Sequence, residues 1–155
     1  MKVEGNYAMG GARPQVYATL CNPTALRHCL PGCEKFDPIG EGRYETQLRT
    51  GVAGVKGSFA GTVTLSNERS PESYTLALEG KFSGGFVKGT GAITLTEEGE
   101  KTRVAYIGDV QIGGPLAGIG QRLMGPAVKT VANAFFKCME GQVSAHGAAE
   151  PMVSG

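Results

Sequence analysis

The segment from residue 33 to residue 112 alternates apolar and polar residues, and short turn sequences interrupt it about every ten residues. Alternation with period two is typical of β-strands that bury one face and expose the other. The turn sequences that separate the strands are Asp37–Gly42, Ala53-Gly54, Arg69–Pro71, Ser83–Gly85 and Glu97–Glu100. Because short connections join antiparallel neighbours, the segment is predicted to form a six-stranded antiparallel meander.

Further elements are predicted on the N-terminal side of this meander. Residues 2–9 alternate in the same way and are predicted to form another strand. Two short helices are predicted between residues 13 and 33. Asn22 is suited to cap the second helix and Pro23 to begin it.

A long helix is predicted on the C-terminal side, over residues 115–140. It is the only predicted element large enough to cover the apolar face of the sheet. The fold class is therefore predicted to be α+β, with a strongly curved sheet wrapped around this helix. The length of the chain predicts a single domain over residues 1–140, and the aperiodic tail 141–155 is predicted to be disordered.

The composition argues against several classes of protein. The net charge is +1 and the charged residues are scattered, so no nucleic-acid partner is predicted. No stretch approaches 18 consecutive apolar residues and no signal segment is evident, so the chain is expected to be cytoplasmic. Cysteines of cytoplasmic proteins are kept reduced, so we expect free thiols rather than a disulfide framework at Cys21, Cys29, Cys33 and Cys138.

The chain contains 25 glycines, more than its turns require, and several of them interrupt the apolar face of successive strands. These inward-facing glycines are Gly61, Gly80, Gly89, Gly91 and Gly108. Glycine in a strand is typical of a bend or bulge, so the pattern is explained by sheet curvature alone. It is also explained by a curved sheet that leaves room for a ligand. Protein interiors contain few empty voids, so space left by missing side chains is expected to hold another molecule.

A ligand cavity between this sheet face and the long helix is thus one of two interpretations. Its predicted lining from the strands comprises Phe59, Gly61, Leu78, Gly80, Phe82, Val87, Gly89, Gly91, Tyr106, Gly108 and Val110. Its predicted lining from the helix comprises Leu116, Gly120, Leu123, Ala127 and Val131.

The periodicity of the long helix predicts which of its sides faces the sheet. At 100° per residue one stripe contains Leu116, Gly120, Leu123, Ala127, Thr130, Val131, Ala134 and Cys138. Val128 and Phe136 are predicted to face solvent, where they would be available to a partner or a membrane surface.

The glycines over residues 118–125 do not have the spacing of a dinucleotide or phosphate-binding loop, which excludes a nucleotide site of those kinds.

The sequence offers little that indicates catalysis or metal binding. His28 lies beside Cys29 and five residues before Cys33, but this is not a zinc-site spacing and a fourth ligand is missing. There is no Gly-x-Ser-x-Gly elbow and no pair of carboxylates that the pattern singles out. No metal site and no catalytic residue is predicted.

Four segments of the chain resemble the CoxG family of carbon monoxide dehydrogenase subunits, which belongs to the START- and Bet v 1-like helix-grip superfamily. They are LRHCLPGCEKF (26–36), KGSFAGTVTLS (56–66), ESYTLALEGKFSGGFVKGTGAITL (72–95) and VQIGGPLAGIGQRLM (110–124). The resemblance runs in order over about residues 1–140. It implies a seven-stranded sheet that grips the C-terminal helix around an apolar cavity.

The resemblance also implies a function. Members of the family are associated with molybdenum-containing carbon monoxide dehydrogenases and related hydroxylases. They are thought to attach the enzyme to the membrane or to hold a quinone, and they carry no redox centre or catalytic residues of their own. Longer members have a membrane-attaching tail. This chain stops at Gly155 without such a segment, so tail anchoring is not expected.

Three hypotheses follow. The first is a non-catalytic protein that binds a quinone- or lipid-like molecule, with no covalently bound cofactor, and serves a molybdenum hydroxylase with peripheral membrane contact. The second is a recruitment module whose cavity is incidental and whose outer surface binds the dehydrogenase. The third is an enzyme, a cyclase or hydrolase, which would require a polar group such as Tyr74, Tyr106 or His28 to face the cavity.

Overall fold

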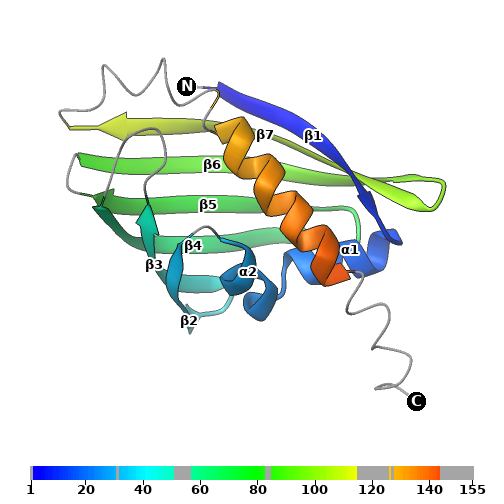
Figure 1. The fold of residues 1–155 in the computed structure, drawn as a ribbon, viewed down its shortest axis with the longest axis horizontal. Coiled ribbons are helices and arrows are strands. Elements are labelled where there is room, and N and C mark those ends of the chain that lie inside the picture. Colours follow the sequence, from blue (N-terminus) through cyan, green and yellow to red (C-terminus); the bar gives the residue numbers. More distant parts are fainter. Residues whose placement is uncertain are drawn as a thin grey trace.

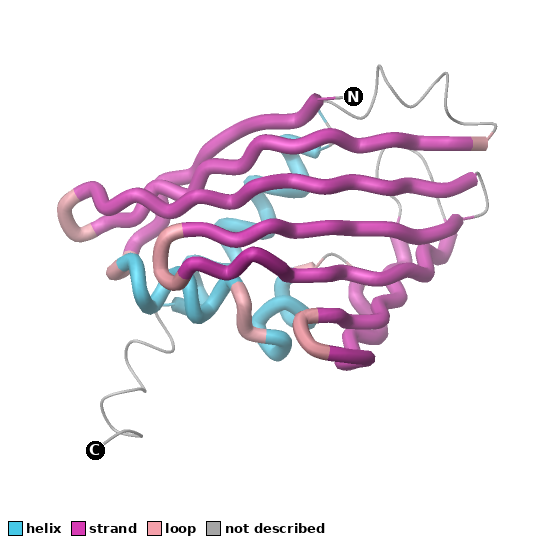
Figure 2. The backbone as a smooth tube through the Cα atoms, turned by 180° about the vertical axis from the view of Figure 1, so that it is seen from behind, coloured by secondary structure: helices cyan, strands magenta, loops and turns pink. Residues whose placement is uncertain are grey.

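The computed structural model describes residues 2–30, 32–50, 57–82, 85–114, 126 and 128–143. Its centre is one antiparallel sheet of seven strands in the order β1-β7-β6-β5-β4-β3-β2 (Figures 1 and 2). The strands are β1 (Lys2–Gly10), β2 (Cys33–Gly40), β3 (Arg43–Thr50), β4 (Gly57–Arg69), β5 (Ser73–Phe82), β6 (Gly85–Glu98) and β7 (Lys101–Gly113). The curved sheet and its helices form a helix-grip α+β fold, and both the fold class and the six-stranded meander are confirmed.

The predicted turn over Asp37–Gly42 is too long. Strand β2 continues to Gly40, and the turn consists of Glu41 and Gly42, where Gly42 has a φ of 68°. Proline lacks a backbone donor and is tolerated mainly on edge strands. Pro38 is compatible with the strand because β2 is an edge of the sheet. The turn at Ala53-Gly54 lies outside the described residues.

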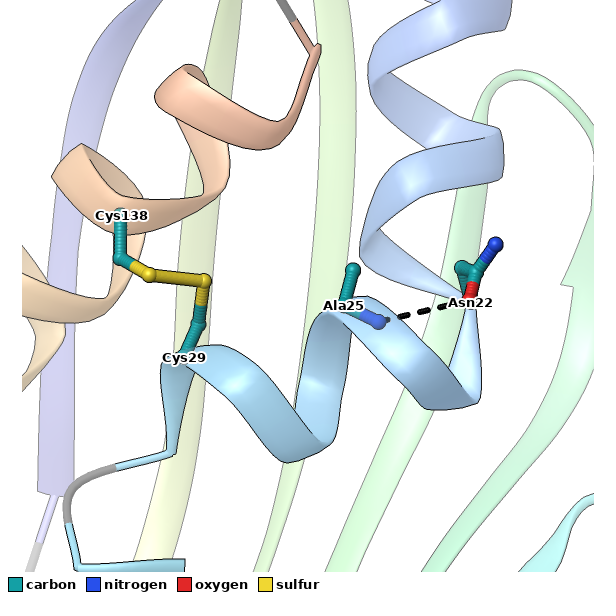
Figure 3. The surroundings of a disulfide bond; sticks show 4 residues. All are labelled: Asn22, Ala25, Cys29 and Cys138. Atoms are coloured by element: carbon teal, nitrogen blue, oxygen red, sulfur yellow. Dashed lines mark hydrogen bonds between the residues drawn. A yellow bond between two sulfur atoms is a disulfide. The ribbon is translucent and has the colours of Figure 1, made fainter. Parts of the chain in front are cut away.

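Helices α1 (Arg13–Leu20) and α2 (Pro23–Cys29) follow β1, as predicted. The Asn22 side chain accepts a hydrogen bond from the backbone N–H of Thr24 at 2.8 Å. It accepts a second one from the backbone N–H of Ala25 at 3.4 Å (Figure 3). Helix α2 therefore begins where the capping signal predicts, with Pro23 in its first turn.

A C-terminal helix comprises residue 126 and residues 128–143 and crosses one face of the sheet (Figure 1). Seen from behind in Figure 2, the helices all lie on the far side of the sheet. This face of the sheet is called the inner face below, and the opposite one the outer face. The helix continues three residues beyond its predicted end at residue 140, and Val143 in that extension is buried.

The predicted orientation of this helix is wrong. Phe136, predicted to face solvent, is 5% exposed and contacts the rings of Tyr7 and Tyr106 at centroid distances of 5.9 Å. Thr130 and Ala134, predicted to face the sheet, are exposed. The prediction gave weight to a stripe that is made mostly of small residues. The buried side is instead set by the large residues Phe136, Met139 and Val143, with Ala132 and Phe135 partly buried beside them.

The prediction of free thiols at all four cysteines is also wrong. Cys29 at the end of α2 and Cys138 on the C-terminal helix form a disulfide, with their Cα atoms 5.5 Å apart (Figure 3). Cys21 and Cys33 are free. The bonded cysteines are 109 residues apart, and the prediction relied on the expected compartment, which carries no information about their proximity.

The hydrophobic core lies toward one end of the inner face. This end, called the hairpin end, has the β4–β5 and β6–β7 turns and is covered by α1: Tyr17 donates a hydrogen bond to the Ser73 carbonyl oxygen at 3.0 Å. The side chains that are less than 2% exposed here include Met9, Val16, Leu20, Leu95, Val104 and Met139. The other end, where β7 ends at Gly113, is called the glycine end.

Candidate functional site

The inner face at the glycine end contains every strand residue predicted to line the cavity. The register places Gly61 opposite Gly80, Leu78 opposite Gly89, and Gly91 opposite Gly108. Residues directly opposite in an antiparallel pair project to the same side, so the predicted apolar face is a real face of the sheet.

Several apolar side chains on this part of the inner face are only half-buried. They are Leu76, Leu78, Phe82, Val87, Val110 and Ile112. Their counterparts at the hairpin end, such as Ile93, Leu95 and Val104, are buried. An apolar surface that points inward and is incompletely covered is the usual lining of a ligand site.

The surface is also uncharged. From the row that contains Tyr74 and Tyr106 to the glycine end, the inward positions of the described strands β1 and β3–β7 carry no Asp, Glu, Lys, Arg or His. Asp109 has the opposite parity and is exposed on the outer face. Such a surface suits a neutral apolar molecule, because these described strand positions offer no countercharge to an ionised group.

The glycines themselves allow close packing. A side chain at Gly80 would collide with the Phe59 ring, and one at Gly5 would lie 2.7 Å from the Tyr106 ring carbon that bears the hydroxyl. A Cβ at Gly108 would lie 2.7 Å from the Gly91 Cα atom. These contacts support the interpretation of the glycines as sites of curvature and close approach.

Gly89 is less crowded, since an added Cβ would meet its nearest atom, the Asp109 carbonyl oxygen, at 3.3 Å. Val131 on the C-terminal helix is half-buried. The remaining predicted helix residues, Leu116, Gly120, Leu123 and Ala127, lie outside the described residues, so the ligand cavity that they would close stays a prediction.

One carboxylate joins the C-terminal helix to β1. Glu140 accepts a hydrogen bond from the Gly10 backbone N–H at 2.6 Å and another from the Tyr7 hydroxyl at 3.3 Å. Burial raises the pKa of Tyr7, and the charge and hydrogen bond of Glu140 raise it further. Both carboxylate oxygens are thus occupied in attaching the helix to the edge of the sheet.

Two tyrosines are the notable polar groups of the inner face. Tyr74 is 5% exposed and its ring packs edge-on against Tyr17, with centroids 5.6 Å apart. Burial raises the pKa of Tyr74 far above its ordinary value, and nearby Cys21 and Tyr17 act in the same direction. Burial also raises the pKa of Tyr106, which is half-buried. Both phenols are therefore neutral hydrogen-bond donors, whereas His28 is exposed on α2.

A shallow, open hollow of about 420 Å³ lies on the outer face of the sheet, where the sequence predicted no site. It is lined by Lys2, Thr75, Thr90, Gly91, Ala92, Ile107, Gly108 and Asp109. Gly91 and Gly108 are shared with the predicted inner lining. The sequence does contain one indication of this hollow. Ile107 is a large apolar residue at an outward position of an alternating strand, and it is 47% exposed.

Among the described residues, no three His, Cys, Asp or Glu side chains are grouped so that they could hold a metal ion. Within the same residues, no helix has the length and apolar character needed to cross a membrane.

Comparison with known proteins identifies the family. A sequence model of the carbon monoxide dehydrogenase subunits known as CoxG matches residues 5–144. The chain belongs to this family. The match begins within β1 and extends past the described end of the C-terminal helix, so it includes the inward positions of β2–β7 described above. No functionally curated protein matches the chain significantly.

Solved structures support the same assignment of fold. A conserved protein from Geobacillus kaustophilus is 31% identical with a TM-score of 0.90, and the match covers 94% of this chain and 97% of that chain. The ZhuI aromatase/cyclase from Streptomyces sp. R1128 is 16% identical with a TM-score of 0.68, covering 94% of each chain. Ara h 8.0201 is 10% identical with a TM-score of 0.70, covering 94% of this chain and 98% of that chain.

Proposed function

We propose that the protein binds a hydrophobic, quinone- or lipid-like molecule between the inner face of the sheet and the C-terminal helix, and that it does so without catalysing a reaction. The observation that carries this proposal is the uncharged inner face at the glycine end, where inward-pointing apolar side chains such as Leu78 and Val87 are only half-buried. Covering such side chains with an apolar ligand is favourable by about 25 cal/mol per Å².

The same surface supports a binding role over a catalytic one. General acid–base chemistry at neutral pH usually requires a carboxylate or an imidazole near the reacting atoms. From the row of Tyr74 and Tyr106 to the glycine end, the described inward strand positions carry neither group, and burial raises the pKa values of Tyr74 and Tyr106, so both phenols stay protonated at neutral pH. The enzyme alternative therefore has less support than ligand binding.

The family match supports a partner. We propose that the loaded protein serves a molybdenum-containing carbon monoxide dehydrogenase or a related hydroxylase, at the cytoplasmic side of a membrane. The sequence had placed the contact surface at Val128 and Phe136, but Phe136 is buried. The outer-face hollow beside Ile107 is the better candidate for a protein contact, because it is open and partly apolar.

Binding can be tested by calorimetric titration with 2-methyl-1,4-naphthoquinone, a neutral ring system of the proposed class. Gly89→Leu adds a side chain to the inner face and is expected to weaken binding at least tenfold. Gly141→Leu is the matched control, since a side chain at this exposed helix position meets nothing within 4 Å. Equal affinity in both variants would contradict the proposed location, and failure of the unaltered protein to bind would contradict the proposed function.

A further inference from the structure

The Cys29–Cys138 disulfide completes a connection between the two edges of the sheet. Strands β1 and β2 are those edges. The C-terminal helix is attached to β1 through Glu140, and α2 packs against β2 on the other side. Because the disulfide joins these two helices, a continuous path runs from one edge across the inner face to the other (Figure 3).

The other specific attachments of the C-terminal helix lie on the β1 side. Glu140 accepts hydrogen bonds from the Gly10 N–H and the Tyr7 hydroxyl, and Phe136 contacts the rings of Tyr7 and Tyr106. Within the described residues, the helix forms no other hydrogen bond, ion pair or ring contact with another element. Loss of the disulfide would therefore leave these contacts at one edge of the sheet and remove the covalent link to the other.

The bond lies near the surface of the protein. Cys29 is 6% exposed, but Cys138 is half-buried, and the preceding residues His28 and Lys137 are both exposed. A thiol reductant needs access to only one of the two sulfur atoms, because exchange begins with the attack of a thiolate on one sulfur. Disulfides in cytoplasmic proteins, where they occur, are mostly transient and either catalytic or redox-sensing.

We propose that the Cys29–Cys138 disulfide is a redox latch that controls release of the ligand from the inner face. This inference rests on the proposed function and adds its regulation. In the oxidised protein the helix is held on both sides and retains the ligand. In the reduced protein the helix keeps its contacts with β1 and β7 but can move away from α2, so the ligand leaves faster.

The reductant is a dithiol. One of its thiolates attacks the Cys138 sulfur, which breaks the S–S bond and releases Cys29 as a thiolate that takes up a proton. The second thiol of the reductant then displaces Cys138 from the mixed disulfide. Two electrons and two protons have then passed to the protein, which holds two thiols, and the reductant has become a disulfide.

The test measures release of N-phenyl-1-naphthylamine, a neutral apolar dye that fluoresces in apolar surroundings and does not react with thiols. Loaded protein is mixed with excess cyclodextrin in a stopped-flow instrument, before and after treatment with dithiothreitol. Reduction is expected to speed release at least about fivefold, the low end of the usual coupling between two sites. Circular dichroism of the same samples checks that the reduced protein stays folded.

Two variants identify the bond as the cause. Cys138→Ser is expected to release the dye at the rate of the reduced protein with or without dithiothreitol. Cys29→Ser removes the same bond from its other end and is expected to behave identically. Cys33→Ser is the matched control, because Cys33 is free and a serine hydroxyl can keep its hydrogen bond to the Lys35 carbonyl oxygen. It is expected to respond to dithiothreitol as the wild-type protein does.

The outcomes separate this inference from the proposed function. If the oxidised and reduced proteins release the dye at the same rate, or if reduction unfolds the protein, the latch is overturned while the apolar site stands. A thiol titration of the untreated, denatured protein that finds all four cysteines free would also overturn it. If the oxidised protein takes up no dye, the proposed function fails and the inference fails with it.

Discussion

Cys29 and Cys138 are covalently joined, so the short helix α2 is attached to the C-terminal helix that crosses the inner face. The bond joins positions 109 residues apart and closes a loop that includes the whole meander. A cross-link of this span restricts the unfolded chain strongly and also holds the wall of the proposed site in place.

Reduction of this bond is expected to lower the free energy of unfolding by about 2–5 kcal/mol, the usual range for a native disulfide. Urea unfolding with and without a phosphine reductant measures the change. Cys138→Ser is expected to match the reduced protein and to be insensitive to the reductant. Cys21→Ser keeps the bond and should remain sensitive. A wild-type protein whose unfolding is unaffected by the reductant would contradict the assignment of the bond.

Stability is expected to fall at alkaline pH. Burial raises the pKa values of Tyr17 and Cys21 to about 12, and Glu68 adds to both shifts. Their ordinary values are 10.0 and 9.0, so above pH 9 the unfolded chain loses protons that the folded chain keeps. This stabilisation is complete below about pH 9 and is lost as the pH rises from about 9 to about 12.

Cys21→Ala separates the contribution of the thiol from that of the tyrosines, since burial also raises the pKa values of Tyr7, Tyr74 and Tyr106. It removes the group that ionises first, so the loss of stability is expected to begin near pH 10 instead of pH 9. Urea midpoints at closely spaced pH values would show the shift. An unchanged midpoint across the whole range in the wild-type protein would mean that neither group is protected by burial.

Glu140→Gln is expected to destabilise the protein by about 1–3 kcal/mol, because it replaces a charged acceptor of the Gly10 N–H and the Tyr7 hydroxyl with a neutral amide. Thermal unfolding of the single variants and of the double variant with Tyr7→Phe gives the coupling energy between the two side chains. Glu100→Gln, in the exposed β6–β7 turn, is the control for lost charge alone. A coupling energy of zero would show that the Tyr7–Glu140 contact contributes nothing.

Two glycines should respond in opposite ways to the same substitution. Gly80→Ala is expected to cost about 1–3 kcal/mol, because its Cβ would collide with the Phe59 ring and lie 2.8 Å from the Ala60 carbonyl oxygen. Gly141→Ala is expected to stabilise the C-terminal helix by up to about 1 kcal/mol, since nothing lies within 4 Å. The free energy of unfolding is measured for both variants. If Gly80→Ala raised it as Gly141→Ala does, the close packing around Gly80 would be contradicted.

Local patterns predicted the order of the elements and the two faces of the sheet. Strand alternation assigns Leu78, Gly89 and Val110 to one face whatever their neighbours are, and the register confirms this. The pair Asn22-Pro23 correctly predicts the start of α2, because helix capping depends only on residues close in sequence.

Features that depend on distant contacts were not predictable in this way. The orientation of the C-terminal helix follows from where Phe136 packs against Tyr7 and Tyr106, and the small residues used to predict it carry too little burial energy to decide it. The Cys29–Cys138 bond likewise depends on two helices that meet only in the folded chain. The hollow beside Ile107 is lined by residues of β1, β5, β6 and β7 together, and alternation within a single strand does not show how these strands combine.

The central claim, that an apolar ligand binds on the inner face at the glycine end, is best tested with single tryptophan reporters, since the chain contains no tryptophan. Phe82→Trp places a reporter on the half-buried inner face, and Phe86→Trp places one on the outer face, where the phenylalanine is 47% exposed. On titration with 2-methyl-1,4-naphthoquinone, we expect saturable quenching of the Phe82→Trp variant and only linear, collisional quenching of the Phe86→Trp variant. Linear quenching of equal slope in both variants would contradict it.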